Sequence, residues 1–204
     1  MAMGSMTEQS SATKLEYRLI LKMAGENSSV LDLGCGDGSL LALLAREKKA
    51  RVQGVELDEK AIYECVGKGL SVFHGDIDSG LPDYPDKSFD YVILNQSLQQ
   101  VKNPDRVLSE ALRVGREVIV GTPNFAYIKA RFDLAFRGKA PITSSLPYEW
   151  YNTPNTHFLS ISDFIEYCRK RSIKIKRQAF VTGRRQIRIM PNLFADIGIF
   201  LIYK

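Results

Sequence analysis

The sequence predicts an α/β fold: a doubly wound, mostly parallel sheet of seven strands with helices on both faces and an antiparallel last strand. Strand-like and helix-like runs alternate as far as about residue 124, which is typical of parallel sheets. The strand-like runs are continuously apolar, as strands covered on both faces are, and glycines occupy the first turn from strand to helix. The chain of 204 residues suits one domain, which we expect to span 6–204.

The alternating part of the chain begins with an amphipathic helix and ends with a fifth apolar strand. Residues 14–25 carry apolar side chains at helical spacing and end in a glycine, which favours a helix. The last helix of this part has Asn103 as its capping residue and Pro104 in the first helical position. Strands are predicted at 28–34, 51–58, 70–77, 88–96 and 116–124, and further helices at 39–49, 59–69 and 103–115.

The pattern changes after residue 124. Residues 124–156 are aromatic, basic and proline-bearing, and the stretch is too long for an ordinary connection. We expect an insert with a helix at about 125–137, followed by a lid or a docking loop. A helix resumes at Ser160, where Asp163 completes an S-x-x-D start signal. Further strands are predicted at 173–183 and 186–190, with a last, partly buried strand at 193–204.

Composition limits the class of protein. Hydrophobic residues make up 45% and charged residues 25%, and no apolar run approaches the ~20 residues that span a bilayer, so we expect a soluble protein without membrane contact. The start of the chain lacks a secretion signal, and residues 1–5 are interpreted as a cloning remnant before a native Met6. Cys35, Cys65 and Cys168 are far apart, which predicts neither a disulfide framework nor a metal site and favours the cytoplasm.

Charge is distributed unevenly along the chain. Residues 1–110 carry 12 Lys and Arg against 17 Asp and Glu, whereas residues 111–204 carry 16 against 6. Nine of the basic residues lie in 169–188, with no acid among them. Such a run could contact nucleic acid, an acidic partner or an anionic substrate. Because it alternates with apolar residues and lacks stacked aromatic pairs, we favour a solvated face and do not expect nucleic-acid binding.

The glycines of the first turn are Gly34, Gly36 and Gly38. In an open parallel sheet this turn lies where ligands bind, and glycine permits positive φ and close backbone approach. A tight turn without a ligand is the alternative. Asp32 and Asp37 flank the turn, and carboxylates there would repel a pyrophosphate but attract an ammonium group. The turn therefore predicts a nucleoside ligand that lacks phosphates and carries a positive charge.

Two further acids end the next two strands. Glu56 ends the second strand, where a carboxylate can accept hydrogen bonds from both ribose hydroxyls. Asp76 ends the third strand, where it can accept from an adenine amine while the backbone N–H of Ile77 donates to a ring nitrogen. Each acid alone could instead cap a helix. Together with the glycine turn they predict a nucleoside site.

These motifs resemble those of class I S-adenosylmethionine-dependent methyltransferases. The resemblance rests on "VLDLGCGDG", "GVELD", "GDID" and "SFDYVILNQSLQQV", covers 28 to about 124, and implies the Rossmann-like class I methyltransferase fold with S-adenosylmethionine as cofactor and S-adenosylhomocysteine as product or bound ligand. The residues that it implies for cofactor binding are Asp32, Gly34, Cys35 and Gly36 at the methionyl end, Glu56 and Leu57 at the ribose, Asp76 and Ile77 at the adenine, and Asn95 near the methyl group.

A second resemblance extends over nearly the whole chain from Leu31 on. "VGTPNF" and above all "LPYEWYNTPNTHFLSISDF" are similar to the MetW family of bacterial methionine-biosynthesis proteins. This resemblance implies a partner, a homoserine O-acyltransferase that forms O-acetyl- or O-succinylhomoserine. We expect that partner to contact the 124–156 insert, with Tyr148 and Trp150 near a lid or interface. The acyl group and the oligomeric state stay open.

Candidates for acid–base catalysis are few. Methyl transfer needs alignment of nucleophile, methyl and sulfur, and an acceptor hydroxyl or amine also needs a general base. His157, just after the insert, is the one candidate, because His74 lies inside a predicted strand. Two interpretations follow: a cofactor-binding partner of the acyltransferase without turnover, or an active small-molecule methyltransferase with an unknown acceptor.

Overall fold

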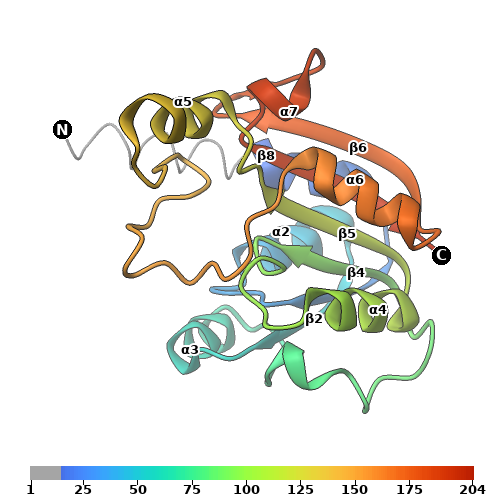
Figure 1. Ribbon diagram of the computed structural model, residues 1–204. Helices are drawn as coiled ribbons and strands as arrows, with labels where there is room; N and C mark the ends of the chain where they lie inside the picture. Colours follow the sequence, from blue (N-terminus) through green and yellow to red (C-terminus); the bar gives the residue numbers. More distant parts are fainter. Residues whose placement is uncertain (1–14) are drawn as a thin grey trace.

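The computed structural model describes residues 15–204, so residues 1–5, the expected cloning remnant, lie outside the described residues. One sheet runs through the molecule with helices on both faces (Figure 1). Its strand order is β3 (Val72–His74), β2 (Arg51–Glu56), β1 (Ser29–Leu33), β4 (Phe89–Asn95), β5 (Gly115–Pro123), β8 (Ile197–Tyr203), β6 (Lys174–Thr182) and β7 (Arg185–Gln186). The strands from β1 to β5 are parallel, and β8, β6 and β7 pair antiparallel. The predicted α/β class is confirmed.

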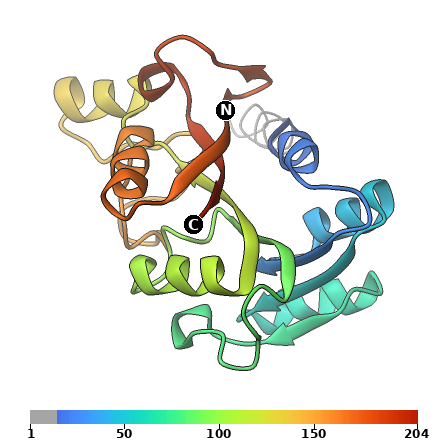
Figure 2. The ribbon, with the colours of Figure 1, turned by 90° about the vertical axis from the view of Figure 1, so that its right-hand side faces the viewer.

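Two helix layers enclose the sheet, as the view in Figure 2 shows. The helices are α2 (Ser39–Lys48), α3 (Glu59–Gly67), α4 (Pro104–Val114), α5 (Ile128–Arg137), α6 (Ile161–Lys170) and α7 (Pro191–Phe194), with the 3-10 helix η1 (Ile77–Ser79). One core lies beneath α4 and α6 and includes Leu108 and Phe164. The opposite core includes Ile93 and Ile119, beneath α2 and an N-terminal helix of which residues 15–23 are described.

The predicted helix starts are confirmed by their caps. The side chain of Asn103 accepts from the backbone N–H of Arg106 at 3.2 Å, with Pro104 in the first position of α4. At α6, Ser160 Oγ accepts from Asp163 N at 3.2 Å, and the Asp163 carboxylate accepts from Ser160 N at 2.8 Å. These reciprocal bonds satisfy N–H groups that a helix start otherwise leaves unpaired.

Three predictions for the C-terminal strands were wrong. The predicted strand at 186–190 is only the two-residue β7, and with it the sheet has eight strands rather than the predicted seven. Residues 193–194 belong to α7. β8 is buried from Ile197 to Ile202 rather than partly buried, since it lies between β5 and β6 and is covered on one face by α6. A short apolar run does not reveal which strands flank it.

The 124–156 insert starts with α5 and is tied to the sheet at both ends. α5 begins at Ile128, three residues later than predicted, because Asn124 Oδ1 accepts from Ala126 N at 3.1 Å in a turn before the helix. The side chain of Asn124 also donates to the carbonyl oxygen of Ala195 at 2.7 Å. At the other end, Thr156 N donates to the carbonyl oxygen of Gln99 at 2.9 Å. The insert is therefore held beside the segment that follows β4.

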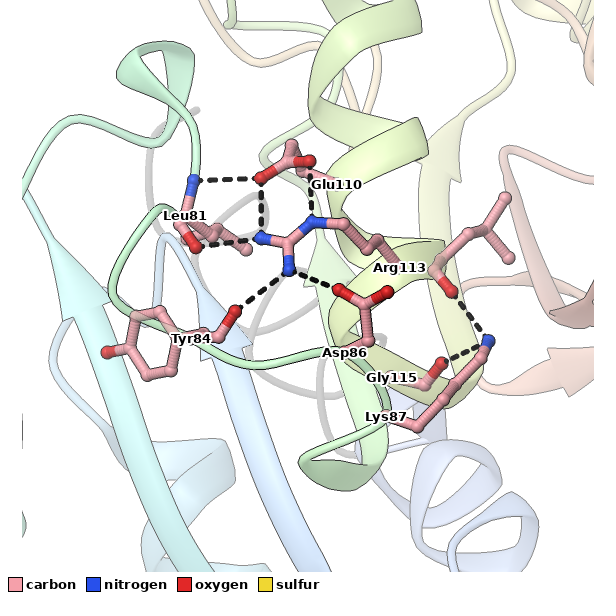
Figure 3. A network of polar contacts seen from close by, with 8 residues as sticks. Leu81, Tyr84, Asp86, Lys87, Glu110, Arg113 and Gly115 are labelled. Carbon is pink, nitrogen blue, oxygen red and sulfur yellow. Dashed lines mark hydrogen bonds and ion pairs between the residues drawn. The ribbon is translucent and has the colours of Figure 1, made fainter.

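Arg113, in the last turn of α4, holds the connection from η1 to β4 (Figure 3). Its guanidinium donates to the carbonyl oxygens of Leu81 and Tyr84 and to the carboxylates of Asp86 and Glu110. Lys87 Nζ adds a bond of 2.7 Å to the carbonyl oxygen of Leu112, which helps to cap the end of α4. This network orders a connection that has no strand or helix of its own between 80 and 88.

The basic stretch 169–188 lies on α6, β6 and β7. Four of its nine basic residues form ion pairs with acids: Arg169 and Lys170 with Glu166, Arg171 with Asp105, and Lys176 with Glu117. These exposed pairs fit the solvated face that we favoured. Within residues 15–204, no helix has the length and apolar character needed to cross a membrane.

Candidate cofactor site

The turn between β1 and α2 has the backbone that its glycines predict. Gly34, Gly36 and Gly38 have φ values of +77°, +53° and +73°. A Cβ at Gly34 would stand 2.9 Å from Ser97 Cβ, and one at Gly38 would stand 2.6 Å from Leu70 Cδ1. At Gly36, by contrast, no atom lies within 4 Å of the Cβ position. A side chain at Gly36 would therefore meet open space, whereas packing leaves no room for one at Gly34 or Gly38.

Glu56, at the end of β2, holds this turn in place. One carboxylate oxygen accepts from Gly36 N at 2.7 Å. The other accepts from the N–H groups of Leu57 and Asp58 at 2.8 and 3.0 Å. The sequence indicated Glu56 as a ribose ligand but not as an anchor of the glycine turn, because the contact spans 20 residues.

A groove of about 530 Å³ opens at the carboxyl ends of the strands, within the size range of ligand sites. Four acids line it, Glu56, Asp58, Asp76 and Asp78, and no Lys, Arg or His stands among its described lining residues. Of the predicted cofactor residues, the groove brings together Gly34, Gly36, Glu56, Leu57, Asp76 and Ile77.

The other three predicted residues, Asp32, Cys35 and Asn95, do not line the groove. The Cys35 thiol packs against Gly54 and Cys65, so this residue could meet a ligand only through its backbone. Burial, with nearby carboxylates, raises the pKa of the Cys35 thiol, which keeps the thiol protonated.

Asp76 and Asp78 line the part of the groove where the sequence predicts the adenine contact. The side chain of Asp76 accepts from Asp78 N at 2.9 Å and caps η1, so its capping role is realised. The Asp78 carboxylate accepts from Lys102 N and Asn103 N at 2.8 and 2.9 Å. It therefore joins η1 to the start of α4.

Two buried carboxyl groups, Asp32 and Glu16, lie outside the groove lining, and burial raises the pKa of each. Asp32 is 2% exposed, its Oδ1 has no partner among the described residues, and burial together with the charge of Glu56 raises its pKa to about 7. Glu16, on the N-terminal helix, is 3% exposed, and burial raises its pKa to about 7 although a hydrogen bond from Gln96 opposes the rise. Within residues 15–204, neither acid forms an ion pair.

Several groove-side residues were missed by sequence reasoning. Gln96 and Ser97 follow β4 and line the groove, as does Tyr148 of the insert. Glu16 could have been found, because its spacing from Leu19 and Ile20 places a carboxyl group on the apolar face of the helix. No local signal reports Tyr148, since its position depends on how the insert folds back.

Tyr148 lines two cavities at once. Besides the groove it lines an apolar cavity of about 330 Å³ with Phe125, Leu146, Trp150 and Phe158 of the insert region. His157, the catalytic candidate, is exposed and lines neither cavity, and its backbone N–H donates to the carbonyl oxygen of Gln99 at 3.0 Å. The structure thus brings Tyr148, but not His157, to the groove.

Comparison with known proteins decides the family. The family model described as methionine biosynthesis protein MetW matches residues 14–202. The chain belongs to the MetW family. A relative of this family, the bifunctional methionine biosynthesis protein MetXA/MetW of Rhodopirellula baltica, is 35% identical over 198 residues, which cover 91% of this chain and 32% of the relative. The chain therefore spans about a third of the length of that relative, and its family associates it with methionine biosynthesis.

Solved structures that resemble the chain share its architecture. An S-adenosylmethionine-dependent methyltransferase of Mesorhizobium loti superposes with a TM-score of 0.69 at 17% identity, covering 95% of this chain and 98% of that one. A SAM-dependent methyltransferase of Thermotoga maritima gives 0.68 at 19% identity, covering 97% and 92%. At such identities the likeness establishes the fold alone, and it confirms the predicted Rossmann-like methyltransferase fold for this MetW-family chain.

Proposed function

We propose that the chain binds S-adenosylmethionine or S-adenosylhomocysteine in the 530 Å³ groove, and that the bound ligand controls a homoserine O-acyltransferase contacting the 124–156 insert. The observation that carries the proposal is the acidic groove itself, with a glycine turn at one end and strand-end carboxylates along it. Such a surface repels phosphates and attracts a sulfonium, an ammonium group and hydroxyl donors.

Each part of the nucleoside has a group that suits it. A carboxylate offers about four acceptor sites, and backbone N–H groups occupy three at Glu56, which leaves capacity for a ribose hydroxyl. Asp76 and the backbone of Ile77 line the groove and suit the adenine, whereas Asp32 is buried outside the lining and suits the ammonium group only by its charge. When bound, S-adenosylmethionine supplies a methyl group on a sulfonium, and these residues bind and orient it.

The insert connects this ligand to a partner surface. Because Tyr148 lines both the groove and the apolar cavity of the insert, a ligand that contacts Tyr148 in the groove can shift how the insert packs. An exposed aromatic residue nearby, Trp150, is a typical interface anchor. The bifunctional MetXA/MetW relative joins the MetW unit to a second function in one chain, which supports a partner of this kind.

The test uses purified homoserine O-acyltransferase from the same source. We expect its acyl-transfer rate to rise when the chain is added and to change severalfold when S-adenosylmethionine is present. Tyr148→Ala is expected to keep the activation and lose the response to ligand, whereas Tyr151→Ala, outside both cavities, keeps both. Equal activation with and without S-adenosylmethionine would contradict control by the ligand. An acyl-transfer rate that the chain does not change would contradict the partnership.

An active small-molecule methyltransferase is the second candidate. It is favoured by Glu16, whose Oε1 accepts at 2.9 Å from Gln96, a residue that lines the groove, and burial raises the pKa of Glu16 to about 7, which suits a general base near neutral pH. This role is expected to appear as slow formation of S-adenosylhomocysteine when candidate acceptors are supplied, and Glu16→Gln is expected to abolish it. If no acceptor yields S-adenosylhomocysteine, this second function is contradicted and only the regulatory role remains.

A further inference from the structure

Six of the nine basic residues in the stretch 169–188 have a partner in the structure. Four pair with acids, one lies over an aromatic ring and one donates to a backbone carbonyl oxygen. The other three, Arg184, Arg185 and Arg188, are exposed and form no ion pair within residues 15–204. They lie in and just after the hairpin formed by β6 and β7, so the end of the basic stretch is a cluster of unpaired cations.

Exposed apolar side chains follow these arginines directly. Ile189 and Met190 are more than half exposed, and Phe194 of α7 is exposed as well. Residues 183–194 contain no Asp or Glu. Because Arg, Met and aromatic residues are enriched at protein interfaces, this combination indicates a surface for interaction.

α5 lies beside this segment at one end of the molecule, as both ribbon views show (Figures 1 and 2). Two hydrogen bonds hold the start of α5 there. The side-chain amide of Asn124 donates to the carbonyl oxygen of Asn192 at 3.1 Å, and the hydroxyl of Thr182 donates to that of Tyr127 at 3.5 Å. α5 and residues 183–194, here named the cationic surface, are therefore neighbouring parts of one end of the molecule.

α5 also leaves an apolar face uncovered. Ile128, Phe132 and Phe136 are exposed and follow one another at intervals of four residues, which places them on one side of the helix. The ring centroids of Phe132 and Phe136 are 5.1 Å apart. The buried residues of α5, Ala130 and Asp133, lie toward its other side. The phenylalanines therefore face away from the part of the insert against which α5 packs.

The cationic surface has almost no acid of its own. It holds six Lys and Arg residues and one Asp. That one acid, Asp133, is buried and pairs with Arg137 at 3.0 Å. Lys129 and Arg131 of α5 are exposed and, among the described residues, pair with no acid. Uncompensated positive charge thus accompanies the exposed apolar side chains.

The combination of charge and apolar groups distinguishes the possible occupants. A second copy of the chain would bring the same positive charges together. A nucleic acid could pair with the cations and stack on the phenylalanines, but it offers little to aliphatic side chains such as Ile128, Ile189 and Met190. A protein with an apolar centre and acidic side chains around it complements both. The bifunctional MetXA/MetW relative favours a protein over a membrane, because it joins the MetW unit to a second function within one chain.

α5 connects the cationic surface to the cofactor groove. Its Leu134 lines the apolar cavity of the insert together with Tyr148, which also lines the groove. Its Lys129 and Arg137 line a cleft of about 790 Å³ together with Trp150. A ligand that moves Tyr148 can therefore change the position of α5 and of the side chains around it.

We propose that the cationic surface is the docking site of a protein partner that presents an apolar centre with acidic side chains around it. The inference rests on the proposed function, which names a homoserine O-acyltransferase as the partner. It deepens that function by placing the contact on α5 and on residues 183–194, outside the insert, and by giving the chemistry of the partner's side.

The charge is tested by surface plasmon resonance of the full chain with the purified homoserine O-acyltransferase at low and at high salt. We expect the affinity to fall as salt is added, because salt screens charge pairs across an interface. Arg188→Glu is expected to weaken binding at least about tenfold and to reduce the salt dependence, because it sets a like charge against the partner's acids. Arg46→Glu on α2, whose side chain is 72% exposed, is the matched control and is expected to stay within about twofold of the parent chain.

The apolar part is tested by Phe136→Ala in the same assay. This side chain is 78% exposed, so its removal is expected to leave the fold intact. We expect binding to weaken about tenfold, as the loss of a buried aromatic anchor implies, with the salt dependence of the parent chain. Tyr63→Ala on α3, an equally exposed aromatic residue, is the matched control and is expected to bind as the parent does.

Binding to the acyltransferase that Arg188→Glu and Phe136→Ala both leave unchanged would overturn this inference and keep the partnership. No binding by the parent chain would overturn the proposed function as well. Binding that needs Arg188 and Phe136 but does not respond to S-adenosylmethionine would uphold the surface and contradict only control by the ligand. Where Arg188→Glu does not fold, Arg184→Glu in the same hairpin is expected to give the same loss.

Two further measurements address the other occupants. Co-sedimentation of the parent chain with phosphatidylserine vesicles, if both variants abolish it while acyltransferase binding persists, would assign the surface to a membrane and overturn the proposal. Sedimentation equilibrium of the chain alone is expected to give the same mass for the parent and for Phe136→Ala. A dimer that Phe136→Ala dissociates would assign the surface to a second copy and would likewise overturn the proposal.

Discussion

The two halves of the sheet's carboxyl edge obtain their polar groups in different ways. At β1, β2 and β3, each group stands on a strand end or in the turn that follows, as Glu56 and Asp76 do. At β4, β5 and β8, only Asn95 stands on a strand end, and the other groups come from distant segments: Glu16 from the N-terminal helix and Tyr148 from the insert. The first half depends on local backbone geometry, and the second depends on tertiary packing.

This difference indicates which substitutions are expected to disturb each half. A substitution in the glycine turn acts directly on the backbone that would hold the ligand. A substitution under the N-terminal helix or in the insert acts through the packing that brings remote side chains together. The predictions below separate these two kinds of effect.

The largest effect is expected in the glycine turn. Gly38→Ala places a Cβ 2.6 Å from Leu70 Cδ1 and 2.7 Å from Cys65 Sγ at a φ of +73°. Left-handed strain and overpacking together are expected to lower the free energy of unfolding by about 2–4 kcal/mol in urea titrations. Gly36→Ala meets no atom within 4 Å and is expected to cost about 1–2 kcal/mol. Equal losses at both positions would contradict the packing argument.

The next effect concerns the connection from η1 to β4, which links the two halves of the sheet's edge. Arg113→Ala removes the bonds to the carbonyl oxygens of Leu81 and Tyr84 and leaves the half-buried Glu110 carboxylate unpaired. We expect a loss of about 2–3 kcal/mol in the free energy of unfolding. Arg116→Ala is the control, because its side chain is 67% exposed and 3.6 Å from Asp90, and it is expected to change stability by at most about 0.5 kcal/mol. Similar values for both variants would contradict the role assigned to Arg113.

The buried carboxyl groups predict a pH dependence. Burial raises the pKa of Asp32 and of Glu16 to about 7, so the folded state binds more protons than the unfolded state between about pH 4.5 and 7. Stability should therefore fall as the pH rises through this window. Glu16→Gln is expected to reduce the slope by up to about 1.4 kcal/mol per pH unit, the contribution of one proton. Unfolding curves at several pH values measure this, and a slope that Glu16→Gln leaves unchanged would contradict the assignment.

The smallest effect is expected at the insert. Tyr148→Ala removes one wall of the groove and is expected to weaken S-adenosylhomocysteine binding about threefold, as the loss of partly exposed apolar contact implies. Tyr151→Ala, which lines neither cavity, should leave the affinity unchanged. A larger effect of Tyr151→Ala would mean that the insert closes on the groove through a different surface.

Sequence reasoning captured the first half of the edge because its signals are local. Glycines at alternate positions, an acid at each strand end and a capping box are read within a few residues, and all are realised in the structure. It failed at β7 and β8, where short apolar runs do not reveal their neighbours. A local signal marked Glu16 as a carboxyl group on an apolar helix face, but its partner could not be predicted, because the link to Gln96 spans 80 positions.

The central claim is that the acidic groove holds S-adenosylmethionine, and calorimetric titration tests it most directly. We expect S-adenosylmethionine and S-adenosylhomocysteine to bind the parent chain with one site each. Glu56→Gln and Asp76→Asn are each expected to weaken both ligands at least about tenfold, since each removes a charged acceptor. Glu59→Gln, an exposed acid at the start of α3 outside the groove, should bind as the parent does. No binding of either ligand to the parent chain, or full binding to Glu56→Gln, would contradict the claim.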